Sequence, residues 1–326
     1  MIIARTPLRI SLGGGGTDLP SYFSKSGEGF LVAAAINKYI YVAVHQPFVD
    51  RYFLKYSELE DVGHVNDIRH PIIREALRLT QIPPGLEVAS LADIPAGTGL
   101  GSSGTFTVGL LNALLAYSNK SVPRREIAQL ACQLEIDTLK QSVGKQDQYI
   151  SAVGGLSQFT FHGDGSVSDS RVPLSKGGRQ ELEENLLLFY TGLRRNASEE
   201  LSAFTDTGSS GDQDLRANLD EVREIGHESA LALANEDFDY FGALLTKQWQ
   251  LKHARSRTQI HERIDGWLSL GLQAGAIGGK LVGAGGGGFL LFLAPDKNSL
   301  RRAMGSLGLV EVHFGFDDVG TTLMPW

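Results

Sequence analysis

A glycine- and serine-rich stretch, PAGTGLGSSG at residues 95–104, has the residue types of a turn that binds phosphate. It lies between an apolar run that predicts a strand and a longer, apolar-periodic run that predicts a helix. Glycines let a phosphate approach backbone N–H groups, and the N-terminus of a helix adds the positive end of its dipole. Ser102 and Ser103 add hydroxyl groups that can reach phosphate oxygens or a metal ion. The stretch therefore indicates an anion site.

The chemistry of this anion site has several interpretations. A Walker A loop requires GxxxxGK[ST], and the stretch has no lysine, which excludes that loop. The dinucleotide pattern GxGxxG is present at Gly99, Gly101 and Gly104, but a second helical run follows the first where a repeating βαβ pattern is expected. A tight strand-to-helix turn, with small residues for packing, also explains the stretch when it is taken alone.

Two carboxylates that follow are candidates for phosphoryl transfer, which depends on positioning and charge neutralisation. Glu135 shares the apolar face of a helical run over residues 123–139 with Cys132 and Leu139. A carboxylate on such a face needs a partner, so Glu135 is either in a structural ion pair or bound to a cation. Asp147, in the sequence GKQDQ, is an acid that the N-terminus of a helix could stabilise.

A second glycine cluster, SLGGGGTDLP at residues 11–20, places four consecutive glycines before Thr17 and Asp18. Glycine loses more conformational freedom on folding than any other residue, so the run is costly to order. It is either a flexible loop or a place where a ligand must approach the backbone closely. A third cluster, at residues 283–288, is either a hairpin connection or part of the same site.

Composition limits the classes of protein to which the chain can belong. Its 326 residues are enough for two domains, and a net charge of −7 without blocks of like charge argues against binding nucleic acid. A single cysteine, Cys132, excludes an internal disulfide framework, and the eight histidines show no metal-binding spacing. No apolar run is long enough to span a membrane and no signal peptide is evident, so we expect a cytoplasmic protein.

The pattern of apolar residues predicts an α+β protein. Strands are expected at residues 2–4, 9–12, 31–35, 40–46, 52–56, 86–91, 186–190 and 310–316, with a hairpin over 156–174 and two strands around the third glycine cluster. Helices are expected at residues 103–117 and 123–139, over most of the chain from 215 to 273, and once more after the third cluster. Residues 206–214 are expected to form a loop. We expect a domain boundary near 172/173, which gives domains of residues 1–172 and 173–326.

Three motifs in one order resemble the GHMP kinases, the family of galactokinase, homoserine kinase, mevalonate kinase and phosphomevalonate kinase. PAGTGLGSS resembles the phosphate loop of that family, RTPLRISLGGGGTD its N-terminal substrate motif, and KLVGAGGGGFLL its C-terminal glycine-rich motif. Together the motifs span nearly the whole chain. The resemblance implies an ATP-dependent, Mg²⁺-requiring kinase with an N-terminal α/β domain and a C-terminal ferredoxin-like α+β domain.

The resemblance also implies roles for individual residues. Asp147 would be the base toward the acceptor hydroxyl, with Arg9 beside it, and Ser103 and Glu135 would bind Mg²⁺. The implied ATP-binding residues are Pro95, Gly97, Gly99, Leu100, Gly101, Ser102, Ser103 and Gly104. The implied substrate residues are Gly14, Gly15, Gly16, Thr17, Asp18, Lys145, Arg194, Gly285 and Gly286.

The N-terminal motif differs from that of galactokinases, and the difference bears on which sugar accepts the phosphoryl group. In galactokinases a Glu-His pair precedes Thr-Asp and contacts the sugar, whereas here Gly15 and Gly16 stand in those places. Three segments, GGGGTDLPSYF, VGKQDQY and TGLRRNAS, most resemble the corresponding segments of kinases that phosphorylate D-glycero-D-manno-heptose 7-phosphate at the anomeric hydroxyl. A related fucose- or galactose-like sugar 1-kinase, or a non-catalytic sugar and nucleotide sensor, remains an alternative. We expect a monomer or homodimer that binds ATP and a sugar or sugar phosphate.

Overall fold

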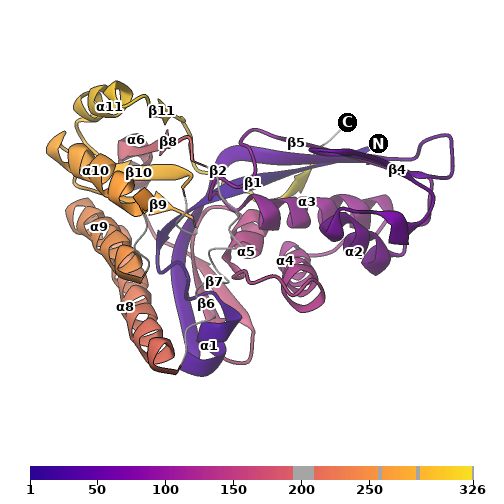
Figure 1. The fold of residues 1–326 in the computed structure, drawn as a ribbon, viewed down its shortest axis with the longest axis horizontal. Coiled ribbons are helices and arrows are strands. Elements are labelled where there is room, and N and C mark those ends of the chain that lie inside the picture. Colours follow the sequence, from indigo (N-terminus) through magenta and orange to yellow (C-terminus); the bar gives the residue numbers. More distant parts are fainter. Residues whose placement is uncertain (194–208, 256–258, 284–286, 325–326) are drawn as a thin grey trace.

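The computed structural model describes residues 1–193, 209–255, 259–283 and 287–324 of the chain. These residues form two β-sheets, each with helices packed against it, and the chain passes from the larger sheet to the smaller one (Figure 1). This is the mixed α+β architecture expected from the sequence. The boundary at 172/173 stays a prediction.

The larger sheet is built around one long strand, β2. The strands of this sheet are β1 (Ile2–Gly13), β2 (Glu28–His45), β3 (Tyr52–Lys55), β4 (Leu59–Val62), β5 (Leu86–Ala92), β6 (Leu156–His162), β7 (Val167–Arg171) and β12 (Thr322–Leu323). The main order is β12-β1-β2-β5-β3-β4, and β6 pairs with the first half of β2 and carries β7. β3 and β5 are parallel, whereas the other pairs are antiparallel. Residues 30–36 of β2 are all buried, which explains their unbroken apolar run.

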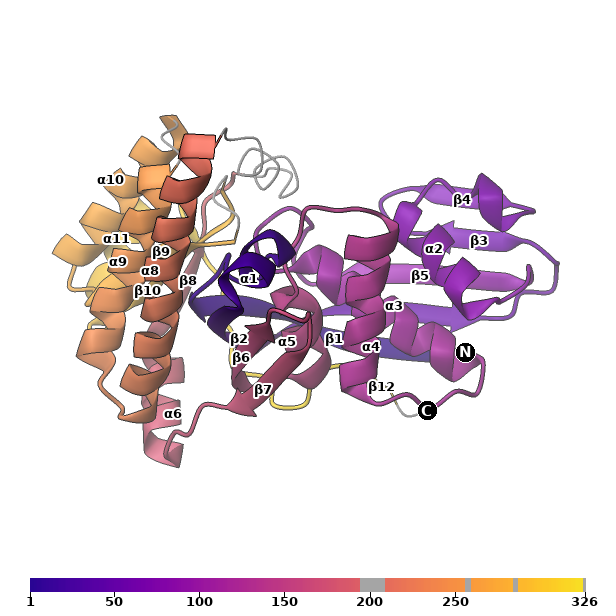
Figure 2. The same ribbon diagram turned by 90° about the horizontal axis from the view of Figure 1, so that it is seen from below.

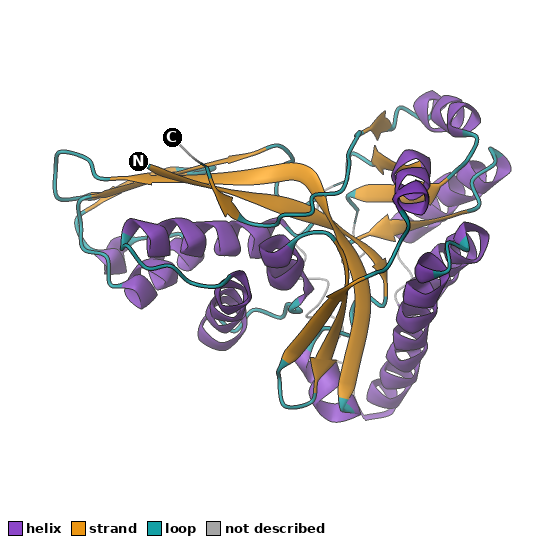
Figure 3. Cartoon of the chain, turned by 180° about the vertical axis from the view of Figure 1, so that it is seen from behind, coloured by secondary structure: helices purple, strands orange, loops and turns teal. Residues whose placement is uncertain are grey.

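The first group of helices lies on one side of this sheet (Figure 3). It comprises α2 (Pro71–Thr80), α3 (Ser102–Tyr117), α4 (Arg124–Cys132), a π-helix (Gln133–Thr138) and α5 (Gln146–Val153). α3 packs on both β1 and β2 and also contacts α4 and α5, so it is at the centre of the layer. A short α1 (Pro20–Ser26) connects β1 to β2, and a 3-10 turn (Val65–Asp67) precedes α2.

The smaller sheet is antiparallel and has the order β11-β8-β10-β9. Its strands are β8 (Leu186–Tyr190), β9 (Gly278–Val282), β10 (Phe289–Leu293) and β11 (Val310–Glu311). The helices of this part are α6 (Lys176–Asn185), α8 (Ser209–Ala234), α9 (Phe238–Arg255), α10 (Gln259–Gln273) and α11 (Lys297–Ser306). α8 and α9 pack together as two long helices (Figure 2), and α8 also contacts β1 and β2 of the larger sheet. Among the described helices, none combines the length and apolar character needed to cross a bilayer.

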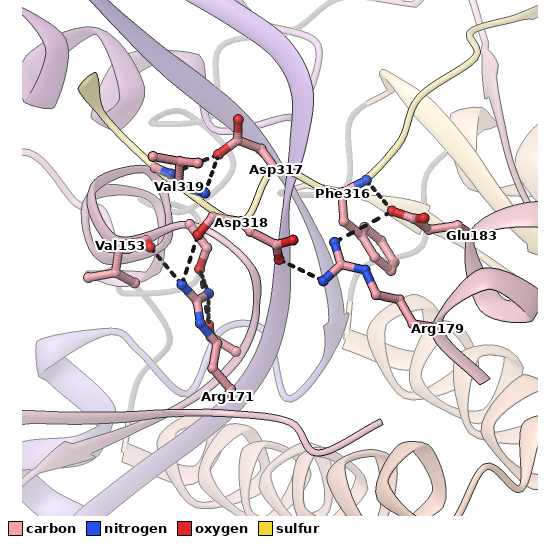
Figure 4. Close-up of polar contacts among 11 residues, drawn as sticks. Val153, Arg171, Arg179, Glu183, Phe316, Asp317, Asp318 and Val319 are labelled. Carbon is pink, nitrogen blue, oxygen red and sulfur yellow. Dashed lines mark hydrogen bonds and ion pairs between the residues drawn. The ribbon is translucent and has the colours of Figure 1, made fainter. Parts of the chain in front are cut away.

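The C-terminal segment returns from the smaller sheet to the larger one and ends in β12, beside β1 (Figure 1). Figure 4 shows how residues 316–319 of this segment are held. Arg179 on α6 pairs with Asp318 at 2.7 Å, and Glu183 accepts a hydrogen bond from the backbone N–H of Phe316 at 2.6 Å. Arg171, at the end of β7, donates to the carbonyl oxygens of Val153 and Asp318. The segment therefore connects elements of both sheets.

Several element predictions need correction. The predicted strands 2–4 and 9–12 are one strand, as are 31–35 and 40–46, because β-bulges let the ladder continue through Pro7 and Lys38. Residues 209–214, predicted as loop, begin α8, since helix propagation from its packed turns extends into the polar end; residues 206–208 lie outside the described chain. The last predicted strand is short, because only Val310 and Glu311 pair with β8. The helices α1, α2 and α6 and the strands β4 and β12 were not predicted.

Candidate active site

A cavity of about 820 Å³ lies where the two sheets meet, and we call it the central cavity. Its wall is formed by the glycine cluster at residues 11–20, by the 95–104 loop, by the start of α5, by α9, and by β9 with glycines that follow it. The predicted site residues that line it are Arg9, Gly15, Gly16, Asp18, Gly97, Gly99, Gly101, Ser102, Ser103 and Asp147. The fold thus brings together residues from three separate parts of the sequence.

Arg9 and Asp147 form an ion pair in the wall of the central cavity, with 2.7 Å between Arg9 Nε and Asp147 Oδ1. Arg9 belongs to β1 and only 6% of its side chain is exposed, whereas Asp147, in the first turn of α5, is 25% exposed. Arg9 Nη1 also donates to the carbonyl oxygen of Gly99 at 2.6 Å. One guanidinium therefore orients the carboxylate and ties it to the 95–104 loop.

Close packing explains the glycines of the 95–104 loop. Gly97, Gly99 and Gly101 have φ angles of 75°, 84° and 79°, a region that side chains with a Cβ rarely adopt. A Cβ on Gly99 would lie 2.6 Å from the carbonyl oxygen of Val282, the last residue of β9 in the smaller sheet. α3 begins at Ser102, so the loop ends at the N-terminus of a long helix, as the predicted anion site requires.

Three residues predicted to bind ATP are not in the cavity wall. Pro95 accepts a hydrogen bond from the hydroxyl of Thr98 at 2.9 Å, which closes the turn. Leu100 is 1% exposed and belongs to the apolar core. Gly104 packs against α5, where a Cβ would lie 2.7 Å from the Cβ of Asp147. These residues shape the loop and set its distance from Asp147.

Ser103, Glu135 and Gln148 form a buried chain of hydrogen bonds behind the loop. The hydroxyl oxygen of Ser103 lies 2.5 Å from Glu135 Oε1, and Gln148 Nε2 donates to Glu135 Oε2 at 2.7 Å. Glu135 is fully buried in the π-helix, and burial raises the pKa of its carboxyl group, an effect that the two hydrogen bonds oppose. Ser103 lines the central cavity and Glu135 lies behind it.

The oxygen atoms around Ser103 fit a small divalent cation. Hydroxyl and carboxylate oxygens are hard ligands, and Mg²⁺ commonly takes one or two carboxylates together with phosphate oxygens and water. Gln148 Oε1 is buried and has no hydrogen-bond partner within the described chain. The described residues contain no group of three or more His, Cys, Asp or Glu side chains arranged to hold a metal. The donor set therefore suits a cation shared with bound phosphates.

The glycine cluster at residues 11–20 has two parts with different surroundings. Gly14 has a φ of 81°, and a Cβ there would lie 2.1 Å from the carbonyl oxygen of Phe30. Thr17 is fully buried, and its hydroxyl donates to the carbonyl oxygens of Gly14 and Phe30 at 2.9 and 2.8 Å. Gly14 and Thr17 are thus packed against β2, whereas Gly15 and Gly16 line the central cavity.

Asp18 joins the glycine cluster to the turn before α5. Its carboxylate accepts from the backbone N–H groups of Gly16 and Gln146 at 3.0 and 3.1 Å. A Cβ on Gly144 would lie 1.8 Å from Asp18 Oδ2, so glycine is required there. Burial raises the pKa of Asp18, and the bond from Gln146 opposes this effect. Asp18 is 1% exposed but still contributes to the cavity wall.

The other predicted substrate residues are placed differently. Lys145 donates to the carbonyl oxygen of Gly165 at 2.6 Å, its ammonium lies 5.2 Å from the centre of the Phe23 ring, and it does not line the central cavity. Arg194, Gly285 and Gly286 lie outside the described residues.

Two groups of residues that line the central cavity were not predicted from the sequence. An aromatic and aliphatic group, Tyr56, His70, Leu91, Ile94 and Phe106, lines the side formed by β5, α2 and α3. A polar group, Gln248, Trp249, Lys252 and Lys280, lines the side formed by α9 and β9. The first group carries no sequence signal because its members are scattered. A lysine within the apolar run before the third glycine cluster is the one signal that could have identified Lys280.

Comparisons with known proteins identify related sequences and folds. Residues 69–155 match the model of the GHMP kinases N terminal domain, and residues 229–308 match the model of the GHMP kinases C terminal domain. The chain is 29% identical to the D-glycero-alpha-D-manno-heptose 7-phosphate kinase of Campylobacter jejuni over 93% of this chain and 94% of that protein. It is 25% identical to the galactokinase of Thermotoga petrophila over 96% of this chain and 95% of that protein.

Solved structures share the fold over its whole length. A D-glycero-D-manno-heptose 1-phosphate kinase from Bacteroides thetaiotaomicron superposes with a TM-score of 0.82 at 24% identity, covering 100% of this chain and 99% of that one. The galactokinase of Lactococcus lactis superposes with a TM-score of 0.75 at 19% identity, covering 100% of this chain and 95% of that one. These similarities confirm the two-domain α+β fold implied by the three motifs. The chain belongs to the GHMP kinases and is an ATP-dependent phosphotransferase with an alcohol group as acceptor.

Proposed function

We propose that the protein transfers the γ-phosphoryl group of ATP to the anomeric C1 hydroxyl of D-glycero-D-manno-heptose 7-phosphate, giving the 1,7-bisphosphate. The observation that carries this proposal is the Arg9–Asp147 ion pair, which lies beside the phosphate loop in a cavity that Gly15 and Gly16 also line. The name of the Campylobacter jejuni relative supports this choice of acceptor. We place the reaction on a route to nucleotide-activated heptose.

In this proposal Asp147 accepts the proton of the C1 hydroxyl as that oxygen forms a bond to the γ-phosphorus. The bond between the γ-phosphorus and the β,γ-bridging oxygen breaks and leaves ADP. Arg9 stabilises negative charge on the transferring group, and the backbone N–H groups of the 95–104 loop bind the other phosphates. Phosphoryl transfer has a loose transition state, so orientation of the hydroxyl contributes along with proton removal.

We propose Ser103 and Glu135 as the protein ligands of Mg²⁺. The bound ion would neutralise charge on the ATP phosphates. Gln148 binds Oε2 of Glu135, whereas Ser103 binds Oε1. The bond from Gln148 therefore fixes the carboxylate with Oε1 directed toward the 95–104 loop. Hydrogen bonds of this kind orient metal ligands in many sites.

The base of ATP fits the aromatic and aliphatic side of the central cavity. Tyr56 and His70 meet edge to face with 4.7 Å between ring centres, and Phe106 lies 5.4 Å from His70. Burial lowers the pKa of His70, which favours a neutral imidazole beside an uncharged base. Leu91 has 74% of its surface exposed at this end of the cavity, where a bound base would cover it.

A screen of acceptors tests the proposed reaction. Purified protein is mixed with Mg-ATP and single sugars or sugar phosphates, and release of ADP is measured. We expect release with D-glycero-D-manno-heptose 7-phosphate and a product with phosphate on C1, identified by phosphorus NMR. Release with free hexoses but not with the heptose phosphate would contradict the proposed acceptor.

A second candidate is a sugar 1-kinase that acts on an unphosphorylated sugar. Relatives named as a bifunctional fucokinase/GDP-fucose pyrophosphorylase in Arabidopsis thaliana and as galactokinases favour this candidate. The same screen separates the two, because fucose or galactose would then be the best acceptor. No ADP release with any acceptor, together with ATP binding, would favour a sensor.

A further inference from the structure

A lysine is buried in the wall of the central cavity. Lys280 occupies the middle of β9, the edge strand of the smaller sheet, and only 4% of its surface is exposed. Its ammonium donates to Gln248 Oε1 at 2.7 Å. Within the described chain no carboxylate lies within 4.0 Å of this ammonium. A buried cation with an uncharged partner costs free energy, so this position favours a function over a purely structural role.

A second lysine faces the cavity beside it. Lys252 follows Gln248 by four residues on α9, so both side chains are on one face of that helix. The Lys252 ammonium donates to the carbonyl oxygen of Gly283, the residue that starts the third glycine cluster. Arg9, Lys252 and Lys280 are the lysines and arginines that line the cavity among the described residues. Burial, and then the charges of Lys252 and Arg9, lower the pKa of Lys280.

Two further polar groups adjoin the lysines. Ser11 follows Arg9 by two residues on β1, so both side chains are on one face of the strand. The Ser11 hydroxyl is buried in a residue that is 7% exposed, lines the cavity, and has no hydrogen-bond partner within the described chain. A Cβ on Gly15 would lie 2.9 Å from this hydroxyl and 4.0 Å from Gln248 Nε2. The side chains of Ser11 and Gln248 therefore both lie next to Gly15.

These groups fit a multiply charged oxyanion better than a neutral sugar. They supply two ammonium groups, an amide nitrogen, and a hydroxyl without a hydrogen-bond partner among the described residues, and charge-assisted hydrogen bonds to an oxyanion are stronger than neutral ones. The carboxylates in the same cavity are already engaged, Asp147 with Arg9 and Asp18 with backbone N–H groups. Lys280 therefore has no carboxylate partner among the described residues of this wall.

We propose that Lys280 and Lys252, with Ser11 and Gln248, bind a phosphate group at a second anion site, separate from the backbone N–H groups of the 95–104 loop. Two phosphates could occupy this site: the phosphate already present on the acceptor, or the γ-phosphate of ATP. The first case rests on the proposed function, because it requires a phosphorylated acceptor. The second requires only a kinase.

The test replaces Lys280 with methionine, which has a similar length and no charge. Inorganic phosphate is titrated into protein saturated with Mg-ADP, so that the loop is already filled, and binding is measured by calorimetry. We expect phosphate affinity to fall at least about tenfold in Lys280→Met, the loss of one charge-assisted contact. Lys247→Met is the matched control, since Lys247 is exposed on the same helix and does not line the cavity. Unchanged phosphate affinity in Lys280→Met would overturn the proposal.

A stability measurement separates this role from a structural one. Methionine removes a buried charge, so a ligand-binding lysine predicts that Lys280→Met resists urea as well as the wild type or better. If the hydrogen bond to Gln248 is the purpose of Lys280, the variant unfolds at lower urea and binds phosphate normally, and the proposal fails.

The source of the phosphate is decided by two further titrations of Lys280→Met. Weaker binding of D-glycero-D-manno-heptose 7-phosphate, with the unphosphorylated heptose unaffected, assigns the site to the acceptor. Weaker binding of Mg-ATP, with Mg-ADP unaffected, assigns it to the γ-phosphate. If the wild type does not bind the heptose phosphate at all, the proposed acceptor is wrong, while the inorganic phosphate titration still decides the second anion site.

Discussion

At the scale of single residues, the ion pair between Arg9 and Asp147 is the centre of the proposed reaction. The two residues are 138 positions apart, yet their side chains meet at 2.7 Å in the wall of one cavity. Arg9 has a further bond to the carbonyl oxygen of Gly99, so a change in any of these residues affects the other two. Partners of this kind are expected to act as a unit, with effects that do not add.

Asp147→Asn tests the base assigned to the reaction. Asparagine keeps the size of the side chain but cannot accept the proton, so we expect turnover to fall at least about 100-fold with little change in ATP binding. Turnover is measured by ADP release at saturating substrates, and ATP binding by calorimetry. Asp137→Asn is a suitable control, because Asp137 is exposed on the π-helix. A variant at position 147 with near wild-type turnover would show that the carboxylate only orients the hydroxyl or is not needed.

At the scale of elements, the π-helix sets the position of Glu135. The sequence predicts one continuous helix over residues 123–139, and its periodicity correctly places Glu135 on a buried face. The structure instead ends α4 at Cys132 and continues with a π-helix over Gln133–Thr138. Such turns are rare and occur often at functional sites, because the extra residue redirects the side chains that follow. Periodicity predicts burial, but it does not predict that Glu135 meets Ser103 and Gln148.

Gln148→Leu tests whether the chain of hydrogen bonds behind the loop supports a metal ligand. Leucine removes the donor to Glu135 without adding charge, so the carboxylate loses one of its two fixed contacts. Residues that orient metal ligands are typically worth about 10- to 100-fold in metal affinity. We therefore expect the Mg²⁺ concentration for half-maximal activity to rise at least about tenfold. Gln133→Leu, at an exposed position of the same π-helix, should leave this concentration unchanged; an equal rise in both variants would argue against the role of Gln148.

At the scale of the whole molecule, contacts between the two sheets position the central cavity. α8 packs on β1 and β2, and Gly99 of the loop nearly touches Val282 and Gly283 after β9. The C-terminal segment links the same two parts from the other side, through Arg179 and Asp318 on the one hand and Arg171 on the other (Figure 4). Opposite walls of the cavity thus come from elements far apart in the chain.

Arg171→Ala tests the contribution of this link. Arg171 donates to the carbonyl oxygens of Val153, Gly154 and Asp318, and backbone oxygens bound by a charged group typically stabilise a fold more than neutral pairs do. Because the side chain is partly exposed, we expect a loss of about 1–2 kcal/mol in the free energy of unfolding, measured by urea denaturation with circular dichroism. Arg51→Ala removes an exposed ion pair to Asp61 and should cost less than about 1 kcal/mol. Equal losses in the two variants would contradict a special role for Arg171.

The sequence by itself determined the family, the order of the motifs, most of the strands and helices, and the presence of a glycine-rich loop at residues 95–104. These features depend on local properties of the sequence: the spacing of glycines, the periodicity of apolar residues, and motifs that are contained within short segments. The closely spaced loop glycines, for example, were evident from PAGTGLGSSG, and the φ angles of Gly97, Gly99 and Gly101 give the reason for them.

Only the tertiary structure decided which side chains meet. It packed Gly14 and Thr17 against β2 and directed Lys145 toward Gly165. It also brought Lys280 from the smaller sheet into the wall that contains Arg9. Such contacts depend on the register of strands and on the packing of α9 against β9, which sum small energies over many distant residues. For that reason the glycines of SLGGGGTDLP could be recognised in the sequence, while the lysines that face them could not.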